Sequence, residues 1–173
     1  LCATLLGGLF FAGTASAQNV TTEILEDAQN LSDRWVHYGR NYGAWRYMPD
    51  DQINRETVKD LSPVWIKQTG VTGGAFEVTA LVNDGRMYLT TANSHLMVVD
   101  PMTGAELWRY DHNFEDVDLC CGPHNRGVAL YEDMVFYGTL DAHLMAFDAA
   151  TGTQLWDTEV GDNRESLSIT GAP

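Results

Sequence analysis

The strongest constraint on the fold is an internal repeat of 48 residues. The segment VNDGRMYLTTANSHLMVVDPMTGAELW (82–108) aligns without a gap with LYEDMVFYGTLDAHLMAFDAATGTQLW (130–156). Repeats of about 40–50 residues with several short strands are typical of β-propeller blades. We therefore expect an all-β chain, the first blades of a propeller, with four strands among others: Met87–Thr90, His95–Val99, Val135–Gly138 and His143–Phe147.

Both copies end in the pattern Asp-x-x-Thr-Gly-x-x-x-Trp. The aspartate can cap a tight turn by accepting backbone N–H bonds, and the glycine permits positive φ. The tryptophan has a large contact area and an indole N–H that needs a partner. An ordinary hairpin with a buried Trp is the alternative, but two ungapped copies favour a device that docks blade against blade. Its expected members are Asp100, Gly104, Trp108, Asp148, Gly152 and Trp156, with both tryptophans buried.

The chain between the N-terminus and the first repeat has three features. Apolar residues recur at helical spacing over 20–37, which predicts a short amphipathic helix. The aromatic and glycine-rich stretch WVHYGRNYGAWRYMPDDQIN predicts an ordered loop. The segment VKDLSPVW ends at Trp65 and resembles a degenerate copy of the docking device, with a strand expected at Val64–Gln68.

The first 17 residues predict an export signal. Residues 1–22 carry no charge, Leu5–Ala12 are apolar or glycine, and Ala15-Ser16-Ala17 fits an A-x-A cleavage site. The apolar run is too short to span a bilayer. We therefore expect a signal peptide lacking its basic start at 1–17, cleavage near Ala17, a periplasmic protein without a transmembrane segment, and one propeller part at 18–173.

The formal net charge of -14 restricts the partners. It argues against binding to nucleic acid or to anionic membrane surfaces, and it would suit a cationic protein partner.

Two adjacent cysteines, Cys120 and Cys121, are the only ones left after signal cleavage. In an oxidising compartment they can pair, although two free thiols remain the alternative. Zinc is disfavoured because adjacent cysteines lack the usual ligand spacing. A disulfide between neighbours closes almost no loop, so any benefit would be a rigid local surface rather than global stability.

The segment DLCCGPHNRGVALYEDMVFYGTLDAHLMAFDAATGTQLW resembles the quinoprotein alcohol dehydrogenases of the methanol and ethanol type, which use pyrroloquinoline quinone (PQQ). The stretches WVHYGRNYGAWRYMPDDQIN, FEVTALV and SITGAP match in the same order, so the resemblance covers roughly residues 33–173. In that family the fold is an eight-bladed propeller with PQQ near its axis.

The resemblance implies a set of cofactor-binding residues. Cys120 and Cys121 would form a vicinal disulfide under PQQ, and Arg126 would bind a carboxylate or the quinone edge. Glu77 would hydrogen-bond the cofactor, and Thr170 would contact a carboxylate. Judged by the residues alone, Arg126 could be a surface salt-bridge residue, Glu77 a solvated turn and Thr170 a strand hydroxyl.

The histidines receive no such role. His37, His95, His112, His124 and His143 show no metal-ligand spacing. His95 and His143 occupy equivalent repeat positions, which favours a structural role. His124 lies in the cysteine loop and stays unassigned.

The implied function is oxidation of a primary alcohol by PQQ and a bound Ca²⁺ or lanthanide ion, with a cytochrome c as electron acceptor. No residue of this chain is expected to be the catalytic base or a metal ligand, so these 173 residues alone should be inactive. The alternatives are a non-enzymatic propeller scaffold of the outer-membrane assembly type, which needs no cysteine pair, and a membrane-bound quinoprotein sugar dehydrogenase. The sequence leaves open the alcohol, the metal, a fused cytochrome domain and the oligomeric state.

Overall fold

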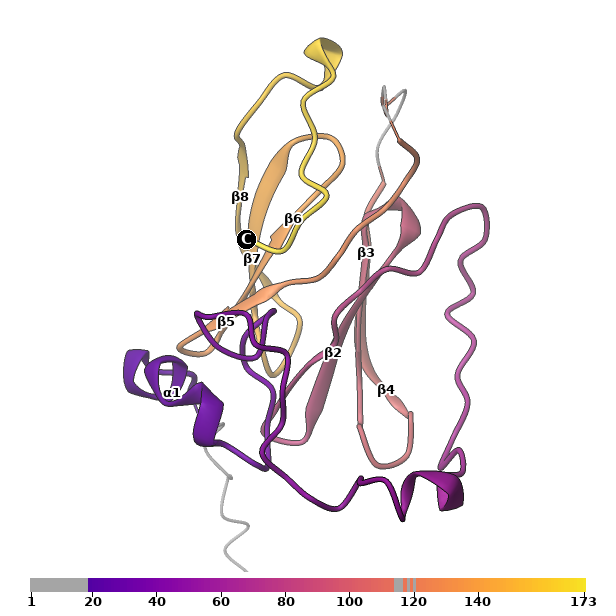
Figure 1. Ribbon diagram of the computed structural model, residues 1–173. Helices are drawn as coiled ribbons and strands as arrows, with labels where there is room; N and C mark the ends of the chain where they lie inside the picture. Colours follow the sequence, from indigo (N-terminus) through magenta and orange to yellow (C-terminus); the bar gives the residue numbers. More distant parts are fainter. Residues whose placement is uncertain (1–18, 114–116, 118, 120) are drawn as a thin grey trace, which may run out of the picture.

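The computed structural model describes residues 19–113, 117, 119 and 121–173. Strands dominate this part of the chain, and the helical pieces are short (Figure 1). The elements are α1 (Thr22–Glu26), η1 (Ala28–Asn30), η2 (Val58–Asp60), β1 (Leu81–Asn83), β2 (Arg86–Thr91), η3 (Ala92–Ser94), β3 (His95–Val99), β4 (Glu106–Asp111), β5 (Ala129–Tyr131), β6 (Met134–Gly138), β7 (His143–Asp148), β8 (Gln154–Glu159) and η4 (Asn163–Glu165).

The strands form two antiparallel four-stranded sheets, β1-β2-β3-β4 and β5-β6-β7-β8, which lie side by side (Figure 1). We call them blade 1 and blade 2. The pairing repeats in detail: a register shift between Val98 and Val99 recurs between Ala146 and Phe147. β2, β3, β6 and β7 confirm the four strands expected from the repeat. The two blades confirm the prediction of an all-β, partial propeller.

The closing turn of blade 2 receives a tryptophan from blade 1. The Asp148 carboxylate accepts hydrogen bonds from the backbone N–H groups of Ala150 and Thr151, at 3.1 and 2.7 Å. Gly152 has φ +72°, and a Cβ there would lie 2.6 Å from the Trp108 ring. The Trp108 indole N–H donates to the Ala149 carbonyl at 3.2 Å. The indole therefore packs where only glycine leaves room.

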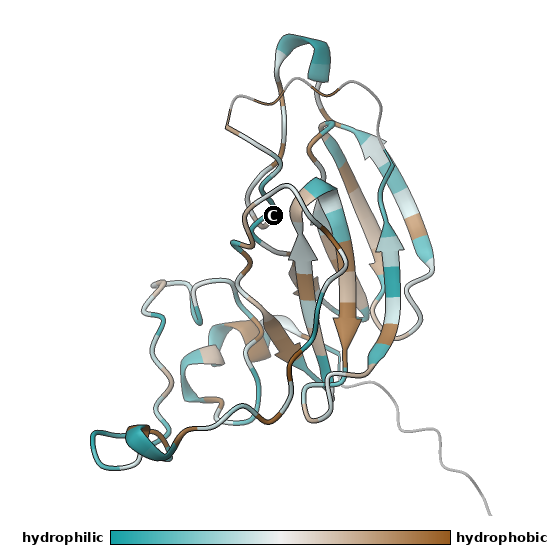
Figure 2. Cartoon of the chain, turned by 90° about the vertical axis from the view of Figure 1, so that its right-hand side faces the viewer, coloured by the Kyte–Doolittle hydropathy of each residue, from teal (hydrophilic) through white to brown (hydrophobic). Residues whose placement is uncertain are grey.

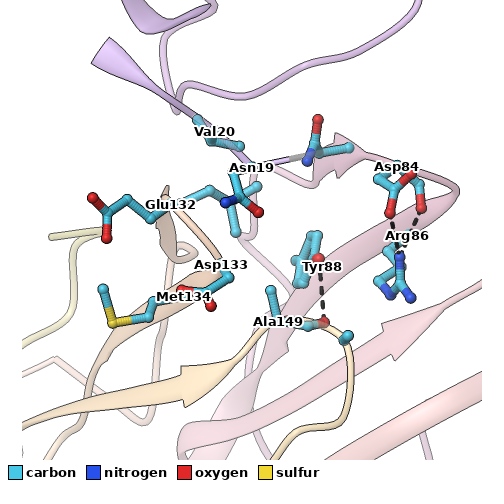
Figure 3. Close-up of a pocket in the computed structure, with 12 residues that line it drawn as sticks. Asn19, Val20, Asp84, Arg86, Tyr88, Glu132, Asp133, Met134 and Ala149 are labelled. Carbon is cyan, nitrogen blue, oxygen red and sulfur yellow. Dashed lines mark hydrogen bonds and ion pairs between the residues drawn. The ribbon is translucent and has the colours of Figure 1, made fainter. Parts of the chain in front are cut away.

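The same seam is bridged from β2. The Tyr88 hydroxyl donates to the Ala149 carbonyl at 3.3 Å (Figure 3). With Trp108, this carbonyl receives donors from two strands of blade 1. Burial raises the pKa of Tyr88 to about 12, which keeps it a neutral donor. The N-terminal segment crosses beside this seam, where Val20 pairs with Glu132 (Figure 3).

Blade 1 receives Trp65 in the same way. The Trp65 indole donates to the Pro101 carbonyl at 2.9 Å, and a Cβ on Gly104 would lie 2.7 Å from its ring. Asp100 caps this turn as expected. Neither docking tryptophan of the repeats is fully buried as predicted, because Trp108 is partly buried and Trp156 is 37% exposed. Among the described residues, no third turn of this kind is present to receive it.

The helix expected over 20–37 is wrong in length. α1 and η1 end at Asn30, and the chain then becomes extended. Trp35 exchanges two backbone hydrogen bonds of 2.8 Å with Val82 of β1. The edge strand β1 thus offers backbone N–H and C=O groups that an extended segment can pair with and a helix cannot. This pairing outweighs the helical spacing of the apolar residues.

The strand expected at Val64–Gln68 is also absent from the described structure. Instead, side-chain contacts join this segment to β4. Lys67 Nζ lies 3.5 Å from Glu106, and the Arg109 guanidinium donates to the Thr69 carbonyl at 3.2 Å. A strand requires a neighbour that exchanges backbone hydrogen bonds, and the described chain offers this segment none.

The apolar core runs through both blades. Hydrophobic residues lie along the strands of both blades, whereas the η4 turn at the tip is hydrophilic (Figure 2). Within the described residues, no helix is both long and apolar enough to cross a membrane. The main buried cluster is Val20, Ala28, Val36, Leu81, Tyr88, Leu96, Val98, Val128, Leu130, Val135, Tyr137, Met145 and Phe147.

Candidate functional site

The link between β4 and β5 contains the loop 121–127, which we call the cysteine loop. Three separate segments fix its backbone. The Pro123 carbonyl accepts from the Asn93 N–H at 3.2 Å, and the Arg126 carbonyl accepts from the Thr79 N–H at 3.1 Å. The Arg126 N–H donates to the Thr170 carbonyl at 3.0 Å. The loop therefore lies where the turn after β2, the segment before β1 and the C-terminal segment meet.

This arrangement brings together three residues that the sequence singled out. Arg126 Nη2 lies 2.9 Å from Glu77 Oε2, and Nη1 lies 3.5 Å from the Thr170 carbonyl oxygen. The Arg126 and Glu77 side chains are 39% and 36% exposed, so a ligand can reach both. The contact with Thr170 uses its backbone oxygen, and Thr170 lies in irregular structure rather than in a strand.

The cysteines are only partly described. Cys121 is exposed and disulfide-bonded. Cys120 lies outside the described residues, so the pairing of Cys120 with Cys121 stays a prediction.

Asn125 is a residue of the site that the sequence reasoning missed. It is 1% exposed, its amide donates to the Gly138 carbonyl at 2.8 Å, and its Oδ1 accepts from the Gly127 N–H at 3.1 Å. The Thr90 hydroxyl donates to the Asn125 carbonyl at 3.3 Å. Asn125 thus anchors the cysteine loop to both blades. The available signal was the Asn-Arg-Gly order in the loop, in which a buried amide precedes a positive-φ glycine.

His124 folds back over the cysteine loop. Its Nε2 lies 2.7 Å from the Cys121 carbonyl oxygen, and its Nδ1 lies 3.6 Å from Glu77 Oε1. The sequence assigned no role to His124, but in the structure it contacts two predicted site residues, Cys121 and Glu77.

A second residue missed in the sequence is Arg40, in the aromatic loop. It is fully buried, its guanidinium donates to the carbonyls of Leu31 and Arg34, and it lies over the Trp35 ring at 5.3 Å. Burial lowers its pKa, because it favours the uncharged form of the guanidinium. Arg40 holds the N-terminal segment together and is a structural residue.

A histidine–carboxylate pair crosses the seam between the blades. His112 Nε2 lies 2.9 Å from Asp141 Oδ1, and the Thr139 hydroxyl donates to the same oxygen at 2.5 Å. Burial raises the pKa of Asp141, but the hydrogen bonds from Thr139 and His112 outweigh it, and the net pKa is lowered. The other ring nitrogen of His112 lies 3.0 Å from the Tyr110 hydroxyl. This pair ties β4 to the turn before β7.

His95 and His143, at the starts of β3 and β7, each contact an aspartate, which fits the structural role expected for them. His95 Nδ1 lies 3.5 Å from Asp111, and His143 Nδ1 lies 2.7 Å from Asp157. Each pairs an inner strand with the outer strand of its own blade. Within the described ranges, no group of three or more His, Cys, Asp and Glu side chains is placed to hold a metal ion.

The site suits a planar anionic ligand such as PQQ. Its planar guanidinium, Arg126, can make paired hydrogen bonds to a carboxylate or to adjacent quinone oxygens. The Glu77 carboxylate balances the charge of the Arg126 guanidinium. Both side chains are still partly exposed in this ion pair. His124 Nδ1 is buried and has no hydrogen-bond partner among the described residues. A ligand bound here could supply one.

The family model described as the glucose/ethanol/alcohol dehydrogenase β-propeller domain, termed PQQ, matches residues 35–164. The quinoprotein alcohol dehydrogenase PedH of Pseudomonas putida is 40% identical over 176 residues, which cover 98% of this chain and 29% of PedH. A quinoprotein ethanol dehydrogenase of Pseudomonas aeruginosa is 36% identical, over 99% of this chain and 28% of its own length. The chain therefore spans less than a third of these relatives.

Solved structures give the same result. The quinohemoprotein alcohol dehydrogenase of Comamonas testosteroni matches with a TM-score of 0.80 at 35% identity, over 87% of this chain and 23% of that protein. A europium-containing methanol dehydrogenase matches with a TM-score of 0.75 at 30% identity, over 88% of this chain and 27% of its own.

Proposed function

We propose a function from the premise that this chain belongs to the PQQ family of glucose, ethanol and alcohol dehydrogenases, through its β-propeller domain. The natural protein that contains it oxidises a primary alcohol to the aldehyde with PQQ and a bound metal ion. The relatives named above are alcohol, ethanol and methanol dehydrogenases, which favours an alcohol over a sugar.

One observation carries the proposal: Glu77 and Arg126 form a 2.9 Å ion pair on the accessible side of the cysteine loop. The two residues lie 49 positions apart, on opposite sides of blade 1 in the sequence. A non-enzymatic scaffold needs only the tryptophan docking and gives no reason for this pair.

The described residues bind and orient the cofactor. Arg126 would donate to a carboxylate or quinone oxygen of PQQ, and Glu77 would hold the guanidinium in place through their 2.9 Å ion pair. The loop that carries Cys121 lies beside them and is fixed by Asn125. When bound, PQQ supplies the quinone that accepts two electrons from the alcohol.

The metal ion, Ca²⁺ or a lanthanide, has no ligand set within the described residues. We assign its binding and the catalytic base to residues outside that part of the chain. A metal ion bound at the quinone would act as a Lewis acid.

The remaining parts of the proposal concern location and electron transfer. Residues 1–17 read as an export signal and lie outside the described residues, and on that basis we place the enzyme in the periplasm. An exported enzyme that reduces its cofactor requires an acceptor, and we propose a cytochrome c. The net charge of -14 supports docking of a cationic protein.

The test is alcohol-dependent dye reduction by the purified natural protein, with and without added PQQ and Ca²⁺ or a lanthanide. We expect turnover with a primary alcohol and little with glucose. Arg126→Ala should weaken PQQ binding about tenfold to a hundredfold, the size of a lost hydrogen bond to a charged group.

Arg164→Ala is the matched control, because Arg164 also forms a 2.9 Å ion pair with a carboxylate, Asp162, but is 89% exposed. Turnover that requires glucose rather than an alcohol would favour the sugar dehydrogenase. A folded protein that binds no PQQ would favour the scaffold.

A further inference from the structure

The feature that the proposed function does not use is the position of His124. Its ring stands between the Cys121 carbonyl oxygen, 2.7 Å from Nε2, and Glu77 Oε1, 3.6 Å from Nδ1. Glu77 precedes blade 1 and Cys121 follows it, so one imidazole ring bridges two segments that are far apart in the sequence.

The hydrogen-bond chemistry fixes the role of one ring nitrogen, Nε2. A carbonyl oxygen only accepts, so Nε2 carries the hydrogen that is donated to Cys121. Nδ1 is left facing the Glu77 carboxylate, buried and without a hydrogen-bond partner among the described residues. Other buried side-chain atoms of the described residues also lack a hydrogen-bond partner, and what sets His124 Nδ1 apart is its position against the Glu77 carboxylate.

The local sequence allows the ring to fold over the loop. Gly122 has φ +98°, and a Cβ there would lie 3.0 Å from His124 Nε2 and 3.4 Å from Cε1. The His124 N–H donates to the Gly122 carbonyl at 2.9 Å, which closes a tight turn around Pro123. A side chain at position 122 would strain the backbone and displace the ring.

The Glu77 carboxylate is thereby approached from two directions, and the contact with His124 is attractive when Nδ1 also carries a hydrogen. Oε2 lies 2.9 Å from Arg126, and Oε1 faces His124 at 3.6 Å. Without the histidine, only the pair with Arg126 remains, and the carboxylate is free to rotate about its last side-chain bond.

We propose that His124 is a positioning residue of the cofactor pocket, which links the Cys121 carbonyl to the Glu77 carboxylate and so sets the orientation of the Glu77–Arg126 pair. This inference rests on the proposed function, since PQQ is the ligand that this pair would bind.

The test is a double-mutant cycle on PQQ affinity, measured by calorimetric titration of the metal-loaded natural protein freed of PQQ. His124→Phe keeps a planar ring without either nitrogen, and His124→Gln keeps an amide donor. We expect H124F to weaken PQQ binding about fivefold to tenfold and H124Q to restore most of the loss, a coupling of ordinary size for neighbouring residues. In an E77Q background, H124F should have little further effect, because the group that His124 positions is already altered.

His143→Phe is the matched control, because it removes a histidine–carboxylate contact of 2.7 Å on the β7–β8 pair and should leave PQQ affinity unchanged. If H124F fails to fold, Gly122→Ala takes its place, since it displaces the ring and should also weaken binding. Wild-type affinity in H124F, or effects of H124F and E77Q that add independently, would overturn the inference while leaving the proposed function intact. A wild-type protein that binds no PQQ would overturn both.

Discussion

Replacing Trp108 with alanine probes the contact that joins the two blades. The Trp108 indole fills the space over Gly152 and donates to the Ala149 carbonyl at 3.2 Å. Its ring is stacked 6.4 Å from Phe147 and meets Tyr88 edge-on at 6.5 Å. The substitution removes all of these contacts and leaves a space that the neighbouring turns cannot close.

The magnitude follows from two parts. Truncation of a packed Trp to alanine costs about 3–5 kcal/mol, of which the indole hydrogen bond accounts for about 1 kcal/mol. Because Trp108 is only partly buried, we expect the lower end, about 3 kcal/mol. Trp108→Phe keeps an aromatic ring and loses the donor, so it should cost about 1–2 kcal/mol.

The assay is thermal unfolding of the natural protein followed by far-ultraviolet circular dichroism. Unfolding of a multi-blade protein need not be two-state, so midpoints are compared rather than free energies. If a protein of the relatives' length, roughly 600 residues, unfolds as one unit, a loss of about 3 kcal/mol lowers the midpoint by roughly 2–3 °C. Trp45→Ala is the control, since Trp45 is 67% exposed on the aromatic loop and should change the midpoint little. A W108A midpoint equal to that of wild type would refute the docking role.

Three further outcomes are expected. Mass spectrometry of the non-reduced protein should find one peptide with Cys120 and Cys121 that is two hydrogens light, and two free thiols would contradict the pairing. The hydrogen bond to Asp157 raises the pKa of His143 against the effect of burial, so the stabilisation is present below about pH 6.5 and is lost as the pH rises through the raised pKa. The melting-temperature difference between wild type and His143→Gln should therefore be larger at about pH 5.5 than at about pH 9, and an equal difference would contradict it. Gly152→Ala should lower stability by roughly 1–3 kcal/mol, because φ is +72° and a Cβ would lie 2.6 Å from the docked indole; an unchanged melting temperature would show that the turn can adapt.

The strands of the two blades could be predicted because the repeat has no gaps. An ungapped copy puts strands and turns at equivalent positions, and the structure repeats even the irregularity between Val98 and Val99. The turn chemistry of Asp100 and Asp148 was also readable, because a capped turn depends on neighbours in the sequence.

The errors lie where distant partners decide the outcome. The helical spacing over 20–37 gives way to the pairing of Trp35 with Val82, which no local pattern predicts. Trp65 docks as its sequence pattern indicates, but the residues around it form no strand without a neighbouring edge. Trp156 carries the same pattern and stays partly exposed, since its burial depends on a further turn.

The sequence indicated which residues lie at the candidate site but not how they contact one another. The resemblance indicated Glu77, Arg126 and Thr170, and the structure brings all three together. Asn125 and His124 owe their roles to carbonyl and carboxylate groups that folding brings close to them. The order and spacing of residues in the sequence do not reveal these partners.

The most direct test of the central claim is the PQQ content of the purified natural protein. The protein is isolated from cells that make PQQ, then denatured, and the released cofactor is quantified by absorbance and mass spectrometry. We predict about one PQQ per chain in wild type, retained in Arg164→Ala and largely lost in Arg126→Ala. A folded wild-type protein that contains no PQQ, and that takes none up when it is added, would contradict the assignment of this pocket.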